Sequence, residues 1–155
     1  MALLPVEEAL RRVLDGAMPL GSETVGLLDA AERVLAADVT AQLTQPPFDA
    51  SAMDGYAVRI ADLQRPDTRL KVTQKIPAGS TGKPLAPGTA ARIFTGAPIP
   101  PGADAIVMQE HCTQEGDEVV VKRVPASGEW IRLTGSDIGA GGEVLQAGIR
   151  LRPQD

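Results

Sequence analysis

The chain has 155 residues, of which 43% are hydrophobic and 3% are aromatic, and its net charge is -5. The acidic balance, without any basic run, excludes a nucleic-acid binder, and no apolar stretch reaches the roughly 20 residues that span a bilayer. A single cysteine, Cys112, excludes an internal disulfide framework, and the N-terminus has no basic leader, so a cytoplasmic protein is expected.

The first third of the chain is predicted to contain two helices separated by a short strand. An amphipathic helix over residues 5–15 is marked by apolar residues at helical spacing, which are Val6, Ala9, Leu10, Val13 and Leu14. A short strand is expected over residues 23–28. Asp29 and Glu32 match a capping box and predict a second helix over residues 30–36. The apolar residues that this helix would bury are Ala31, Val34 and Leu35.

Short strands are predicted for much of the remaining chain. Over residues 70–76, apolar and polar side chains alternate as in a half-exposed strand. Further strands are expected over residues 93–94, 105–108, 119–124, 144–145 and 149–151. Residues 115–117 are typical of a hairpin turn, which would join the strands 105–108 and 119–124. The 16 glycines and 13 prolines favour such short elements, and the predicted fold class is α+β and β-rich.

The segment of residues 46–58 carries the densest mixture of polar and large apolar side chains in the chain. It holds two carboxylates and a hydroxyl, which need water, protein partners or a ligand, and three large side chains, Phe48, Met53 and Tyr56. We expect Met53 and Tyr56 in the core with Phe48 packed nearby, and Asp49 in a turn or cap.

Several polar residues of this region have both a structural and a functional interpretation. Asp54, which precedes Gly55, could hold a divalent cation, orient a water molecule or cap a turn. Thr95 and Gly96 could present a hydroxyl and backbone N–H groups to an anion, or end a strand in a β-turn. Ser51 could donate to an anionic oxygen or bond to its own turn.

Three other motifs lack residues that their usual functions require. The stretch 78–84 resembles a P-loop, but it has Pro84 where a serine or threonine is required. The glycines of residues 139–142 lack the last glycine of a dinucleotide fingerprint. His111 and Cys112 have no second cysteine or histidine to complete a zinc site, and a position at a strand end is expected for them.

Three blocks of the sequence, residues 46–58, 91–110 and 131–138, resemble the motifs of the molybdopterin molybdenumtransferase family, which includes the bacterial MoeA proteins and the E domain of gephyrin. The blocks occur in family order and cover most of the chain. One departure is Ser136, which stands where family members often carry a glutamate.

The resemblance implies an activity in molybdenum cofactor biosynthesis, the insertion of molybdate into adenylylated molybdopterin, with Mg²⁺ as cofactor. It implies that Asp54, Thr95 and Asp137 are catalytic, with Asp54 also a metal ligand. Ser51 and Gly96 would bind substrate.

The resemblance also implies a domain organisation. An elongated domain would comprise residues 1–45 and 137–155, and a β-rich domain, residues 46–136, would be inserted in it. The family's pterin-binding and C-terminal domains would be absent, so this chain would supply half of a composite site in a homodimer and would be inactive alone. The alternatives are a non-catalytic dimerisation or binding module and, on strand-rich composition only, a carbohydrate or peptide binder.

Overall fold

The computed structural model describes residues 4–18 and 20–155 of the chain. This part is β-rich and has one α-helix, which confirms the predicted fold class. Contacts divide the chain into two units, Met1–Val39 with Leu145–Asp155, and Thr40–Val144. The chain passes between the units within β1, Val39–Thr40, and β10, Glu143–Leu145. The domain boundaries implied by the resemblance stay a prediction.

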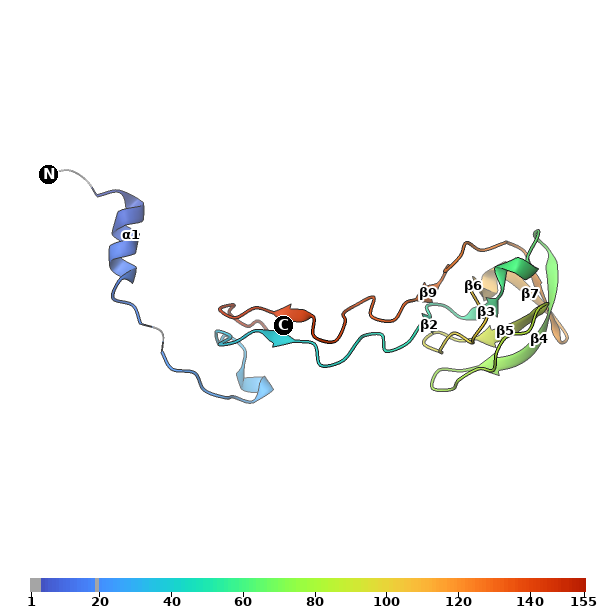
Figure 1. Cartoon of the computed structure of the whole chain (residues 1–155), viewed down its shortest axis with the longest axis horizontal. Coiled ribbons are helices and arrows are strands. Elements are labelled where there is room, and N and C mark those ends of the chain that lie inside the picture. The colour runs from blue at the N-terminus through green and yellow to red at the C-terminus, as the bar shows by residue number, and fades with distance from the viewer. Residues whose placement is uncertain (1–3, 19) are drawn as a thin grey trace. The chain divides into compact units, whose positions relative to one another are not determined.

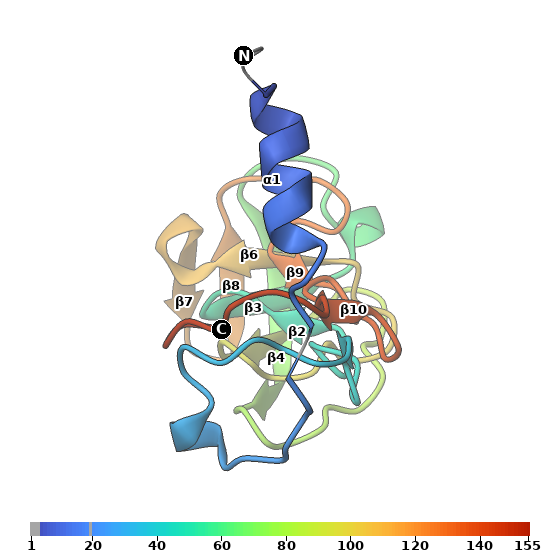
Figure 2. The same ribbon diagram turned by 90° about the vertical axis from the view of Figure 1, so that its left-hand side faces the viewer.

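The predicted N-terminal helix is present as α1, Val6–Leu14 (Figure 2). Pro5 precedes it, and Glu7 and Glu8 lie in its first turn, where the helix dipole favours negative charge. Every residue of α1 is exposed or half-buried. Its apolar stripe therefore remains largely open to solvent in this structure.

Two other predictions for the first unit are wrong. Residues 23–28 form no strand, and a short 3₁₀ helix occupies Leu27–Asp29. Residues 30–36 form no α-helix and leave Val34 exposed, because their backbone pairs with the C-terminal segment instead. The N–H of Glu32 donates to the carbonyl of Leu151 at 2.8 Å, and Val34 forms a β-bridge with Arg150. Pairing with a segment distant in sequence thus outweighs the local helix signal.

In the described part of the second unit, six strands form one sheet in the order β6-β3-β5-β4-β8-β7 (Figure 1). Only the pair β4–β5 is parallel. The strands are β3, Gly55–Val58; β4, Thr68–Ile76; β5, Thr89–Ile93; β6, Ala105–Met108; β7, Cys112–Glu115; and β8, Glu118–Val121.

The sequence predicted four of these six strands at least in part. The alternation over residues 70–76 is confirmed in β4, whose Leu70 and Ile76 are buried while Lys71 and Lys75 are exposed. The predicted hairpin turn is present, but it joins β8 to β7 rather than to β6. Strand β7 was missed because its four residues, Cys112–Glu115, are mostly polar.

Apolar residues cover both faces of this sheet. One cluster includes Tyr56 and Val58, and the other includes Ala57, which alternates with them along β3. All four residues of β3 are buried, and Tyr56 lies in the core as predicted. Phe48 does not, since 44% of it is exposed. The chain just before Gly55 is consequently attached to a rigid, fully packed strand.

The remaining elements of the second unit are short. Strand β2, Ala50–Ser51, pairs with β9, Ile131–Arg132, and 3₁₀ helices occupy Ile60–Asp62 and Gln109–His111. Cys112 begins β7, so the prediction of a strand end for it is confirmed. Among the residues described, no helix combines the length and apolar character needed to cross a membrane.

Candidate functional site

Asp54 and Thr95 are in direct contact. Antiparallel pairing sets Gly55 of β3 opposite Ile93 of β5, so the chain before β3 meets the chain after β5. There, Oδ1 of Asp54 accepts the backbone N–H of Thr95 at 2.9 Å and its hydroxyl at 2.8 Å. Two residues that were selected separately from the sequence therefore form one polar pair.

The glycine after Asp54 allows two strands to pack closely. Gly55 lies within β3, and a Cβ atom at this position would be 2.1 Å from the carbonyl oxygen of Val107 in β6. A side chain would therefore push β3 away from β6. The same packing fixes where Asp54 leaves the sheet.

The bonds from Thr95 lower the pKa of Asp54, with the backbone N–H as the largest cause, the hydroxyl second and the charge of Arg92 a smaller contribution. Asp54 is thus a carboxylate at neutral pH and a weak proton acceptor. An oxygen of this kind is better suited to hold a cation or orient a water molecule than to remove a proton.

Arg92 supports this pair and was missed from the sequence. Its guanidinium donates to the carbonyl of Gly55 at 2.8 Å and to Oε1 of Gln109 at 2.6 Å. The N–H of Gln109 in turn donates to the carbonyl of Asp54 at 3.1 Å. The guanidinium also lies 4.5 Å from the centre of the Phe94 ring. Arg92 is the one charged residue within β5, which was the available signal.

A second pair repeats the geometry of the first. Oδ1 of Asp49 accepts the backbone N–H and the hydroxyl of Thr134, both at 2.8 Å, and these bonds lower the pKa of Asp49. Each threonine precedes a glycine at positive φ, 80° at Gly96 and 71° at Gly135. The segment from Asp49 to Asp54 is therefore fastened at both ends by the same arrangement.

The two predicted substrate-binding residues are held by internal bonds. Ser51 is 2% exposed, and its hydroxyl donates to the carbonyl of Met53 at 2.6 Å, so it bonds to its own turn. The N–H of Gly96 donates to the carbonyl of Ser51 at 2.8 Å. In this structure, both residues shape the backbone around Asp54.

Asp137 lies on a different segment from the Asp54–Thr95 pair. It is exposed, and its Oδ2 accepts a bond from the guanidinium of Arg132 at 3.2 Å. Arg132 belongs to β9, which pairs with β2 at Ala50. The structure thus joins Asp137 to the region of Ser51 through Arg132, a residue that the sequence reasoning missed although it stands in the third family-like block.

Arg132 and Thr95 line one hollow of about 580 Å³, a volume typical of small-molecule sites. Among the described residues that line it, Arg132 is the only charged one. The full lining is Pro46, Pro47, Phe48, Ala50, Ser51, Ala52, Thr95, Gly96, Trp130, Ile131 and Arg132.

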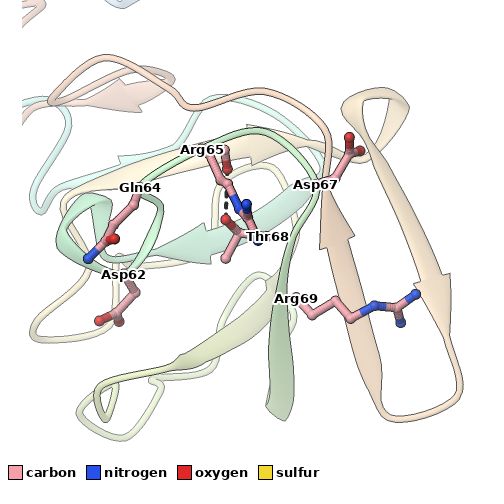
Figure 3. Close-up of a pocket in the computed structure, with 6 residues that line it drawn as sticks. All are labelled: Asp62, Gln64, Arg65, Asp67, Thr68 and Arg69. Atoms are coloured by element: carbon pink, nitrogen blue, oxygen red, sulfur yellow. Dashed lines mark hydrogen bonds between the residues drawn. The ribbon is translucent and has the colours of Figure 1, made fainter.

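A second hollow, of about 610 Å³, is shown in Figure 3 and lies between Asp62 and Arg69. It contains none of the predicted site residues. Asp62 accepts the N–H of Gly88, and Arg69 donates to Glu115, so charges at both ends of this hollow are already paired with the protein. These contacts make it a less suitable ligand site than the hollow beside Thr95.

In the described part of the chain, no group of three or more histidine, cysteine, aspartate or glutamate side chains is placed to hold a metal ion. Mg²⁺ is often bound by one or two carboxylates together with substrate phosphates, and the single carboxylate of Asp54 fits this kind of site. Cys112 is not a reactive thiol, because burial raises its pKa to about 11.

Comparison with known proteins places this geometry in a family context. The model of the MoeA N-terminal region, domains I and II, matches residues 4–155. Curated proteins named molybdopterin molybdenumtransferase are 44% identical over 135 residues in a Nostoc species and 39% identical over 154 residues in Haemophilus influenzae. These matches cover 84% and 97% of this chain, but 31% and 38% of the relatives.

Among solved structures, a molybdopterin biosynthesis moeA protein from Pyrococcus horikoshii matches with a TM-score of 0.89 at 40% identity. The match covers 99% of this chain and 42% of that protein. The chain therefore spans less than half the length of the relatives to which it is similar.

Proposed function

The chain belongs to the family of MoeA N-terminal regions, and we propose that it is the corresponding part of an enzyme that inserts molybdate into adenylylated molybdopterin. The observation that carries this proposal is the Asp54–Thr95 pair beside a hollow with one cationic side chain. The names of the relatives, molybdopterin molybdenumtransferase, give the reaction class.

The reaction has two parts. Water attacks the adenylate phosphorus, the phosphoanhydride P–O bond breaks, and molybdopterin leaves with its own phosphate while AMP is formed with the water oxygen and a proton is released. The dithiolene takes up molybdenum while one molybdate oxygen leaves as water with the two thiol protons. Both substrates are anions, and the net negative charge of the chain does not attract them. Particular side chains must therefore make the binding of these anions favourable.

Asp54 is proposed to meet the phosphoanhydride side of the substrate. Its bonds from Thr95 use Oδ1, so Oδ2 can accept a bond from the attacking water. Where Mg²⁺ is bound, Asp54 would hold it, and the ion would neutralise charge on the phosphate oxygens. Thr95 fixes the carboxylate in one orientation.

Arg132 is proposed to face an anionic group of the substrate from the other side of the hollow, and Asp137 to orient its guanidinium. Gly96 and Ser51 line the same hollow. The rest of the site would come from the longer protein and from a second subunit, so we propose a cytoplasmic homodimer in which the 155-residue chain alone is inactive.

The direct test replaces Asp54 by asparagine and by alanine in the full-length protein that carries this chain. Formation of molybdenum cofactor is expected to fall by about 10²-fold or more, the usual scale for a positioned carboxylate. The matched control is Asp117→Ala, an exposed aspartate in the same unit whose carboxylate lies 3.8 Å from Lys71. Full activity of a folded Asp54→Ala protein would remove the residue from the mechanism.

The second candidate is a non-catalytic dimerisation module. The exposed apolar residues of α1 favour it, since a helix stripe without cover is a common association surface. The mass of the chain in solution, before and after Leu10→Glu, tests this candidate. A monomer at all concentrations would count against it.

A further inference from the structure

Half of the aromatic side chains of this protein gather at one hollow. The sequence holds only four, and Phe48 and Trp130 both line the hollow beside Thr95. They are 44% and 41% exposed. The other two are engaged elsewhere, because Tyr56 is buried in the core and Phe94 is contacted by the cations of Lys75 and Arg92. Phe48 and Trp130 are thus the two most exposed aromatic side chains, and both are exposed at the same hollow.

The backbone holds Trp130 in place at some energetic cost. Its carbonyl accepts the N–H of Ala52 at 2.9 Å, next to the paired strands β2 and β9. Its φ angle is 58°, in the left-handed region that residues with a side chain rarely adopt. Strained conformations of this kind concentrate at ligand sites, where the surrounding structure enforces them.

The charge of the residues that line the hollow indicates which class of ligand it can bind. Arg132 is the one charged residue among those described in its lining, although the whole chain has a net charge of -5. An apolar, aromatic surface with a single guanidinium suits a flat ring that carries an anionic group. Inorganic molybdate or phosphate alone would make no use of Phe48 and Trp130.

We propose that Phe48 and Trp130 form a stacking site for the flat heteroaromatic ring of a phosphorylated substrate, with its phosphate directed toward Arg132. This subsite rests on the proposed function, whose substrate carries two such rings, a pterin and an adenine. Either ring offers the same face to the aromatic side chains, and the two arms of the test separate them.

Binding can be observed directly because Trp130 is the only tryptophan of the chain. Its fluorescence is measured while the 155-residue chain is titrated with AMP, a 6-substituted pterin, ribose 5-phosphate and inorganic phosphate. We expect saturable quenching by AMP or by the pterin, and binding of ribose 5-phosphate at least about tenfold weaker, as the loss of one stacked ring implies. Two results overturn the proposal: no saturable quenching by either ring, or ribose 5-phosphate binding as tightly as the ring ligand that does quench.

Phe48→Leu keeps an apolar side chain and removes the ring. It should raise the dissociation constant for the ring ligand about tenfold. The control Leu133→Ala alters another exposed apolar residue, which is not in the lining of the hollow, and should leave the constant unchanged. Thermal melting of each variant shows that the fold is retained, and an unchanged constant in folded Phe48→Leu counts against stacking.

The same variant separates this subsite from the proposed function. In the full-length protein, Phe48→Leu should raise the KM for adenylylated molybdopterin while kcat is largely kept, whereas Asp54→Ala should lower kcat. If Asp54→Ala abolishes the activity and Phe48→Leu leaves KM unchanged, the stacking site is wrong and the proposed function stands. If AMP quenches Trp130 but the full-length protein inserts no molybdate, the proposed function fails alone.

Discussion

Oδ1 of Asp54 receives both the backbone N–H and the hydroxyl of Thr95, a residue 41 positions later in the chain. The contact closes the open end of the β3–β5 ladder, because Gly55 and Ile93 are the last paired residues before it. The position of the carboxylate is therefore set by the sheet rather than by a flexible loop. This makes the pair suitable for probing by small changes at either residue.

Thr95→Val should weaken the site without removing the backbone bond to Asp54. The hydroxyl bond at 2.8 Å is lost and the N–H bond stays, so the carboxylate is less firmly held. We expect cofactor formation by the full-length protein to fall about tenfold, within the range for a positioning hydrogen bond. Thr95→Ser restores the hydroxyl and should recover most of the activity. Equal activity of the valine and serine variants would contradict this role.

The Asp49–Thr134 pair should make stability depend on pH in the acid range. The bonds from Thr134 lower the pKa of Asp49 in the folded state, while the unfolded value is about 3.9. The contribution is thus fully present above the unfolded pKa and is lost as pH falls through the folded pKa. The difference in unfolding free energy between wild type and Asp49→Asn should be constant above about pH 5 and shrink below about pH 4. A difference that grows on acidification would refute it.

Gly55→Ala should destabilise the second unit strongly. The added Cβ would lie 2.1 Å from the carbonyl oxygen of Val107, and β3 is buried on both faces, so neither strand can move freely. We expect a loss of about 3 kcal/mol in denaturant unfolding, the upper end of the usual range for overpacking in a core. Gly139→Ala is the matched control, because nothing lies within 4 Å of its added Cβ. It should change stability by less than about 0.5 kcal/mol.

The sequence predicts those parts of the fold whose signal is local. Alternation along residues 70–76 sufficed for β4, and the apolar run 105–108 for β6. The helix expected over residues 30–36 failed because Glu32 and Leu35 bond to residues more than a hundred positions away, which no local pattern contains. Strand β7 was not predicted for a related reason, because its mostly polar residues become a strand only by pairing with β8.

The residues of the candidate site likewise divide into those with a local sequence signal and those whose role depends on distant residues. Asp54 and Thr95 could be selected from their types and from the family-like motifs, and the structure brings them together. Arg92 offered only the weak signal of one charge within a short strand, since its role depends on carbonyls and rings contributed by β3, Gln109 and Phe94. Trp130 could not be selected, because its exposure and its positive φ depend on the folded structure.

Arg92→Lys should reduce activity although the positive charge is kept. The planar guanidinium donates in two directions, to Gly55 and to Gln109, and a lysine ammonium cannot reproduce this fork while lying over the Phe94 ring. Cofactor formation should fall about tenfold. The pKa of Asp54, followed by NMR titration of its carboxyl carbon, should stay below its ordinary value, because the bonds from Thr95 are the largest causes of its shift and the charge at position 92 is kept. Arg69→Lys, at an exposed pair with Glu115, serves as the control. If folded Arg92→Lys keeps full activity, the guanidinium fork is not needed to hold the site.

Trp130→Gly should separate stability from ligand binding. Glycine adopts a φ of 58° without strain, whereas alanine keeps the Cβ that makes this region unfavourable. Trp130→Gly is therefore expected to be more stable than Trp130→Ala by about 1 kcal/mol in denaturant unfolding followed by circular dichroism. Both variants should lose ring binding in calorimetric titration, because neither retains an aromatic surface. If glycine and alanine were equally stable, the backbone at this position would not be strained. If both still bound AMP like the wild type, the tryptophan would owe its conformation to something other than a ligand.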